Sequence, residues 1–173
     1  MKRTVVVALV SFVLGGLAVH AAKTVFDPKA YYAGKEPKEA VAALLARAET
    51  IAGDGSWERI GVGRVYYLSG DKAKGQAIFD GVIGGKVAKS DLYRIGDVYA
   101  TAGEWDKAKP IYERAISMDP EDDRGLLRVG CWYNLNGDRA HAEALFDKAF
   151  ARSPNEIWHY ALAAGSYEGV KPF

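Results

Sequence analysis

The chain has 173 residues, of which 49% are hydrophobic and 26% are charged, a composition that favours one globular domain or one short repeat array. Its formal net charge of +1 argues against the broad basic surface of a nucleic-acid-binding protein. Because Cys131 is the only cysteine, an intramolecular disulfide and a cluster of thiolate metal ligands are both excluded.

Residues 1–21 have the pattern of an export signal. Lys2 and Arg3 precede an uncharged apolar run, Thr4 to Val19, and a cleavage pattern of small residues ends at Ala21. We therefore expect export, most simply to the periplasm, with cleavage after Ala21. The run is short against the ~20 residues of a membrane-spanning helix, and an uncleaved inner-membrane anchor with the body facing the periplasm is the alternative.

Residues 22–55 are expected to form a lead-in and a capping helix. Pro37 suits the first turn of a helix, apolar residues follow at helical spacing as far as Ile51, and Gly53 should end the helix. This helix has the pattern of the second helix of a worn repeat. We interpret it as an N-terminal cap, and a full additional repeat is the alternative.

Three stretches of the chain repeat one another at a nearly constant interval of about 34 residues, and we place them at 56–88, 89–122 and 123–156. Five columns of residues keep this interval: Gly63, Gly96 and Gly130; Tyr66, Tyr99 and Tyr133; Gly70, Gly103 and Gly137; Gly75, Ala108 and Ala142; Phe79, Tyr112 and Phe146. Small residues let two helices approach closely, and aromatic rings fill the space between hairpins. Such hairpins are stable only when stacked.

The middle copy carries the residues of a known motif: Leu92, Ile95, Gly96, Tyr99, Gly103, Ala108, Tyr112 and Pro120. It resembles the tetratricopeptide repeat (TPR), a helix–turn–helix unit of about 34 residues. The resemblance implies an all-α fold, an α-solenoid of three TPR-like helical hairpins between N- and C-terminal capping helices, coiled as a right-handed superhelix. Residues 157–173 are expected to form the C-terminal cap, and Ser90 or Asp91 should be the N-cap of the middle copy.

The remaining residues offer little for catalysis or for a cofactor. After cleavage only His141 and His159 remain as histidines, and neither has the spacing of a metal site with a second ligand. No nucleophile elbow, nucleotide-binding fingerprint or calcium loop is present. We therefore expect a protein that is not an enzyme and that holds no cofactor or metal.

The resemblance also implies that the first helices of successive repeats line a concave groove that binds a protein or peptide. The residues expected to contact this partner are Arg64, Tyr67, Tyr93, Arg94, Asp97, Arg124, Arg128 and Asn134. Arg124 and Arg128 match the basic pair of TPR proteins that grip a terminal carboxylate, whereas Arg94 replaces an asparagine of that subset. Arginine suits an acidic partner. The alternative is an ion-paired surface, in which Arg94 pairs with Asp97 on the same helix.

The sequence thus predicts an exported TPR scaffold that binds a protein or peptide partner in the assembly or maintenance of a bacterial envelope, and the groove arginines favour an acidic partner. It predicts no nucleic-acid partner, and contact with a membrane only through an uncleaved N-terminal segment. One alternative is an accessory subunit of an envelope complex, held through its convex side and its cap helix. A further alternative is a small-molecule-binding or enzymatic role in the groove.

Overall fold

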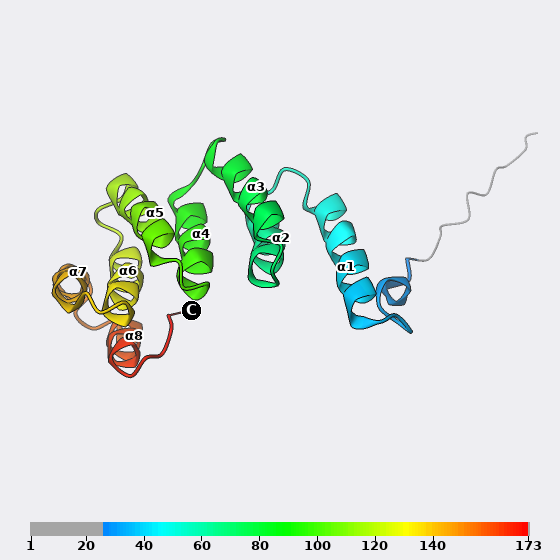
Figure 1. Cartoon of the computed structure of the whole chain (residues 1–173). Coiled ribbons are helices and arrows are strands. Elements are labelled where there is room, and N and C mark those ends of the chain that lie inside the picture. Colours follow the sequence, from blue (N-terminus) through cyan, green and yellow to red (C-terminus); the bar gives the residue numbers. More distant parts are fainter. Residues whose placement is uncertain (1–25, 173) are drawn as a thin grey trace, which may run out of the picture.

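The computed structural model describes residues 26–172, and this part of the chain consists of helices and their connections. The predicted export signal, residues 1–21, lies outside the described residues. Figure 1 shows the helices as a curved row, with α1 at one end and α7 and α8 at the other. No helix within residues 26–172 combines the length and the apolar character that a membrane span requires.

The helices follow one another with short connections. A 3-10 turn, Pro28–Tyr31, precedes α1 (Pro37–Ala52), α2 (Ser56–Leu68), α3 (Lys72–Ile83), α4 (Lys89–Thr101), α5 (Trp105–Met118), α6 (Asp123–Leu135), α7 (Arg139–Arg152) and α8 (Ile157–Tyr167). The most extensive contacts join α2 to α3, α4 to α5 and α6 to α7, while α1 packs on α2 and α8 packs on α6. The predicted all-α solenoid of three hairpins between two terminal helices is confirmed.

In all three hairpins, a glycine of the first helix lies directly against an aromatic ring of the second helix. The pairs are Gly63 with Phe79, Gly96 with Tyr112, and Gly130 with Phe146. A Cβ atom added to Gly96 would lie 2.5 Å from the Tyr112 ring, a separation that real side chains do not adopt. The three rings are buried. The small and aromatic columns of the sequence are therefore the contacts that close each hairpin.

The turn of each hairpin depends on a glycine in the left-handed region of backbone conformation. Gly70, Gly103 and Gly137 have φ angles of +112°, +76° and +85°. A side chain at these positions would be strained, because only glycine adopts such angles readily. The three turns therefore reverse the chain at the same point of each repeat.

The start of α4 differs from the sequence prediction. Ala88 is the N-cap, and Asp91 lies inside the first turn, where its carboxylate accepts a hydrogen bond from the Ala88 N–H at 3.1 Å. The hydroxyl of Ser56 donates to the same carboxylate at 3.1 Å. The predicted N-cap at Ser90 or Asp91 is therefore wrong, because Asp91 binds the helix end from within while it joins α4 to α2.

Candidate partner-binding groove

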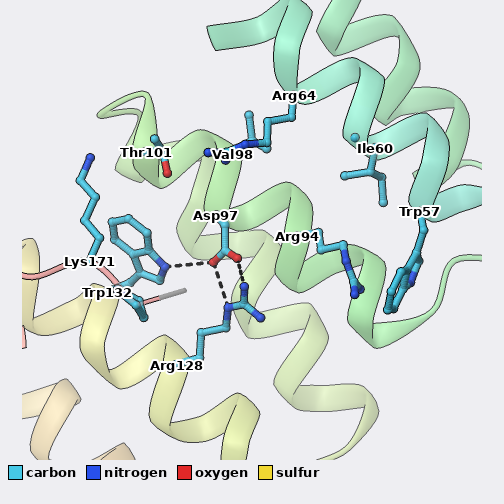
Figure 2. Close-up of a pocket in the computed structure, with 12 residues that line it drawn as sticks. Trp57, Ile60, Arg64, Arg94, Asp97, Val98, Thr101, Arg128, Trp132 and Lys171 are labelled. Atoms are coloured by element: carbon cyan, nitrogen blue, oxygen red, sulfur yellow. Dashed lines mark hydrogen bonds and ion pairs between the residues drawn. The ribbon is translucent and has the colours of Figure 1, made fainter. Parts of the chain in front are cut away.

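The first helices of the three hairpins and the C-terminal tail enclose a cavity of about 440 Å³ on one side of the array. Its walls are formed by Trp57, Ile60, Gly61 and Arg64 of α2, Arg94, Asp97, Val98 and Thr101 of α4, Arg128 and Trp132 of α6, and Lys171 and Pro172 of the tail. We call this cavity the groove (Figure 2). Three arginines and one lysine accompany a single carboxylate, so the charge of the walls is positive.

Asp97 lies at the centre of the groove and accepts hydrogen bonds from two other helices. The hydroxyl of Tyr112 on α5 donates to Asp97 at 2.7 Å, and the indole N–H of Trp132 on α6 donates at 3.0 Å. Arg128 of α6 completes the group with its Nε 3.2 Å from Asp97 Oδ1 and an ion pair to Oδ2 (Figure 2). Asp97 therefore joins the second hairpin to the third.

The Asp97 side chain is only 13% exposed. Burial raises the pKa of Asp97 above its usual range, while the Arg128 guanidinium and the Tyr112 and Trp132 donors act in the opposite direction. Burial, followed by the charge of Asp97, raises the pKa of Tyr112, so its hydroxyl remains a donor. We call Asp97, Arg128 and Trp132, together with their buried hydrogen-bond partner Tyr112, the floor of the groove.

Arg94 and Trp57 form a second feature of the groove, nearer to solvent. The Arg94 guanidinium carbon lies 3.3 Å from the centre of the Trp57 ring, and its Nη1 donates to the Ser90 carbonyl at 3.0 Å. The Trp57 side chain is 57% exposed, and Arg64, further along the same wall of the groove, is exposed as well. We call Trp57, Arg64 and Arg94 the rim of the groove, because Trp57 and Arg64 are exposed and the half-buried Arg94 packs on the Trp57 ring.

Arg124 lies outside the groove, at the exposed start of α6. It lines a neighbouring depression together with Lys89, Arg94 and Arg128. Lys89 in this depression pairs with Asp119 at 2.5 Å and Asp122 at 2.9 Å. The four predicted arginines therefore divide: Arg64, Arg94 and Arg128 line the groove, and Arg124 lies beside it.

Two tyrosines that the sequence placed in the groove are core residues. The Tyr67 ring is 1% exposed and lies 5.4 Å from the Tyr99 ring, measured between centroids, while its hydroxyl donates to Glu104 at 2.5 Å. Tyr93 is 5% exposed, and its hydroxyl lies over Gly125 of α6. Burial is the main cause that raises the pKa of Tyr93 to about 12. These rings fill the space between neighbouring first helices, and neither is among the residues that line the groove.

Two further predicted contact residues have side chains that bond to other residues of the same chain. The Asn134 side-chain amide donates to the Ser166 hydroxyl at 3.0 Å and so joins α6 to α8. Asp97 pairs with Arg128 rather than with Arg94, which was the local alternative in the sequence. Asn134 and Asp97 therefore hold helices together.

The tail after α8 is a part of the groove that the sequence did not reveal. Gly169, with a φ of +80°, and a hydrogen bond from the Val170 N–H to the Gly165 carbonyl at 2.8 Å turn the chain back after the helix. Pro172 is buried, and it lines the groove together with Asp97 and Val98 of α4. A glycine followed closely by Lys171 and Pro172 signals the end of a helix, but it does not say where the tail goes.

Among residues 26–172 no group of three His, Cys, Asp or Glu side chains is placed to hold a metal ion. Cys131 is buried on α6, and its thiol lies 3.3 Å from the Leu162 carbonyl. Burial raises the pKa of Cys131 to about 11, which keeps the thiol protonated and unreactive at neutral pH.

Comparison with known proteins gives one family and several relatives. Residues 90–122, which span the hairpin of α4 and α5, match the family model Tetratricopeptide repeat. Photosystem I assembly protein Ycf3 of Rippkaea orientalis (strain PCC 8801 / RF-1) is 31% identical over 78 residues, which cover 41% of this chain and 42% of that protein. Cellulose synthase operon protein C of Escherichia coli (strain K12) is 35% identical over 65 residues, 35% of this chain and 6% of that protein. The chain thus spans less than half of either relative.

Proposed function

We propose that this chain, which belongs to the tetratricopeptide repeat family, is a scaffold that holds a segment of a partner protein in its groove. Repeats of this family suggest protein–protein interaction as the general role. The rim carries the more specific proposal, because it combines an exposed aromatic ring with two guanidinium groups, an exposed one on Arg64 and a half-buried one on Arg94. Trp57 and Arg94 are also the residue types that most often dominate the energy of protein interfaces.

We propose further that the bound segment is acidic. The floor carboxylate of Asp97 is matched by Arg128, so the charges of Arg64, Arg94 and Lys171 are left to determine what the groove attracts. An arginine donates two parallel hydrogen bonds to a carboxylate, which makes such pairs stronger than neutral hydrogen bonds. Rim charges also accelerate association with a partner of opposite charge, and salt weakens this effect.

The export pattern of residues 1–21 supports a site of action in the bacterial envelope, where the scaffold would serve the assembly or maintenance of a larger complex. One relative is named as an assembly protein, which agrees with such a role. We propose a binding role rather than a catalytic one, since the polar side chains of the groove floor bond to one another.

A photo-cross-linking amino acid at Thr101 tests the proposal, because Thr101 lines the groove and is only half-buried. The matched control carries the same amino acid at Ser117, an exposed residue beside the cavity between α5 and α7 on another face. We expect a cross-linked partner from Thr101 in the producing cells, and none after Arg64→Ala and Arg94→Ala are combined. Adducts from Ser117 alone would instead favour an accessory subunit held by its convex side.

A further inference from the structure

The two terminal helices leave apolar faces open to solvent. On α1 the exposed residues Val41, Leu44 and Ile51 lie at helical spacing with Ala48, so they form one stripe. On α8 the exposed residues Ile157, Tyr160, Ala161, Ala164 and Tyr167 again lie along one side of the helix. Contiguous exposed apolar surface of this kind marks an interaction site more often than scattered single residues do.

The repeat register identifies α8 as the first helix of a fourth hairpin. The N-cap residues of α6 and α8, Asp122 and Glu156, are separated by the same interval as Gly96 and Gly130. In this register Ala164 corresponds to Gly130, which lies beneath the second helix of its hairpin. Ala164 itself is exposed. The open face of α8 is therefore the face that a second helix covers in the other repeats.

The same register identifies α1 as a second helix that lacks its first helix. In the second helices, Gly75 and Ala108 precede the glycine of the next repeat by nearly the same spacing, and both are buried. Ala42 precedes Gly63 by the same number of residues as Gly75 precedes Gly96, and Val41 precedes Gly63 by the same number as Ala108 precedes Gly130. Both Ala42 and Val41 lie on α1 and are exposed. The open face of α1 is therefore the face that a first helix covers in the other repeats.

We propose that α8 of one copy packs against α1 of the next copy and completes a hairpin between the two chains. Within the array, the most extensive helix contacts are those between the first and second helix of a hairpin. Of the pairings between copies, only α8 with α1 recreates this contact, because α8 with α8 joins two first helices and α1 with α1 joins two second helices. In this pairing, α8 of one copy supplies the first helix that α1 lacks, and α1 of the next copy supplies the second helix that α8 lacks.

Charge does not oppose this pairing. The segment Ile157–Tyr167 contains no acidic or basic residue besides His159, which is buried, and the stripe on α1 is uncharged. Burial of the two faces therefore leaves no unpaired carboxylate or ammonium group inside the contact. Because the contact joins different surfaces of each copy, a pair keeps one open α1 face and one open α8 face, and further copies add in a series that either stays open or closes into a ring.

Sedimentation velocity of the full chain over a concentration series tests the proposal, with two variants that each place a charge on one face. Leu44→Lys places a charge on the apolar face of α1, and Ile157→Lys places one on the apolar face of α8. Because both positions are exposed, the melting temperatures of the variants should stay near that of wild type. Met118→Lys, an exposed apolar position at the end of α5, is the matched control. We expect wild type and the control to form species larger than dimers as concentration rises.

Each variant alone should be monomeric, with self-association weakened at least about tenfold, because a buried charge without a partner is costly. An equal mixture of the two variants should form a one-to-one dimer and nothing larger, since one intact α1 face and one intact α8 face remain. A monomeric wild type would overturn the proposal. So would association that neither variant changes, or dimers of Leu44→Lys alone, which would indicate pairing of α8 with α8.

Discussion

The floor and the rim of the groove carry arginines from the same column of the repeat, and yet these arginines have different surroundings. Arg94 and Arg128 occupy equivalent positions of the second and third repeats. Arg128 meets Asp97 of the preceding first helix, whereas Arg94 lies on the Trp57 ring. The residue of α2 that occupies the position of Asp97, one repeat earlier, is Arg64. At the position on the preceding first helix where Arg128 finds the carboxylate of Asp97, Arg94 therefore finds another positive charge, that of Arg64.

This difference shows that the position of a residue in a repeat does not determine its role. One change in the preceding helix, from a carboxylate to a guanidinium, turns a structural ion pair into a surface with unmatched positive charge. Burial and the nearby Arg128 charge lower the pKa of Arg94, while Asp91 and Asp97 act in the opposite direction. The predictions below test this division between floor and rim, beginning with the largest expected effect.

Asp97→Ala should destabilise the chain most, because it removes the acceptor of three donors at once. The Tyr112 hydroxyl and the Trp132 N–H would be left without their partner inside the protein, and Arg128 would lose its counter-charge. We expect the free energy of unfolding in urea to fall by about 3 kcal/mol. Asp97→Asn, which keeps the shape and an acceptor oxygen, is the control and should lose clearly less. Similar losses for both variants would mean that the negative charge, rather than the set of hydrogen bonds, holds the floor together.

Arg128→Ala and Arg94→Ala compare the two equivalent arginines directly. Arg128→Ala leaves the Asp97 carboxylate buried without its cation and should cost about 2 kcal/mol of unfolding free energy. Arg94→Ala loses a contact with the exposed Trp57 ring and should cost less than about 1 kcal/mol. Equal losses, measured by the same urea titration, would contradict the distinction between floor and rim.

Arg64→Asp should give Arg94 of the rim an ion pair like the one between Arg128 and Asp97 in the floor. The new carboxylate would occupy the position of Asp97 one repeat earlier, within reach of Arg94 on the next helix. Because this pair would be partly exposed, we expect a gain in unfolding free energy of only about 0.5 kcal/mol. Arg64→Ala serves as the control that removes the charge without supplying a partner. A gain of the same size from Arg64→Ala would show relief of repulsion rather than formation of an ion pair.

Glu104, a more exposed carboxylate, provides a comparison with the buried Asp97. Hydrogen bonds from Lys107, Lys72 and Tyr67 lower the pKa of Glu104 to about 2 from 4.5. Its folded pKa is depressed, so its contribution to stability is present above pH 4.5 and is lost as pH falls towards 2. Asp97 has the opposite sign, because its pKa is raised in the folded chain.

Glu104→Gln should therefore lower the melting temperature near pH 7 and make its decline between pH 4.5 and pH 2 shallower than in wild type. Melts followed by circular dichroism at several pH values measure this change. The exposed Glu168→Gln is the control, and it should leave the decline unchanged. An unchanged decline in Glu104→Gln would mean that the ion pairs of Glu104 contribute nothing to acid stability.

The fold could be predicted from the sequence because its contacts are periodic. Gly96 against Tyr112 and the left-handed Gly103 each have counterparts one repeat away, so spacing alone identifies them. Tyr67 and Tyr93 were misplaced because the edge that lines the groove and the face between two first helices are adjacent on the surface of a helix. A spacing pattern does not separate two such neighbouring directions.

The site was predictable only in part because its decisive contacts are long-range. Asp97 finds Arg128 on the next first helix, 31 residues away, while Arg94 lies closer along the chain. The return of the tail into the groove depends on the burial of Pro172, which no local pattern encodes. Which arginine has a counter-charge therefore follows only from the packed structure.

The most direct test of the division between floor and rim is the affinity of the partner captured at Thr101 for the double variant Arg64→Ala and Arg94→Ala. Calorimetry should show binding weakened by about 2 kcal/mol relative to wild type, because two charge-assisted contacts are lost. The melting temperature should stay near that of wild type, since neither side chain belongs to the floor. Unchanged affinity in a folded double variant would contradict the account.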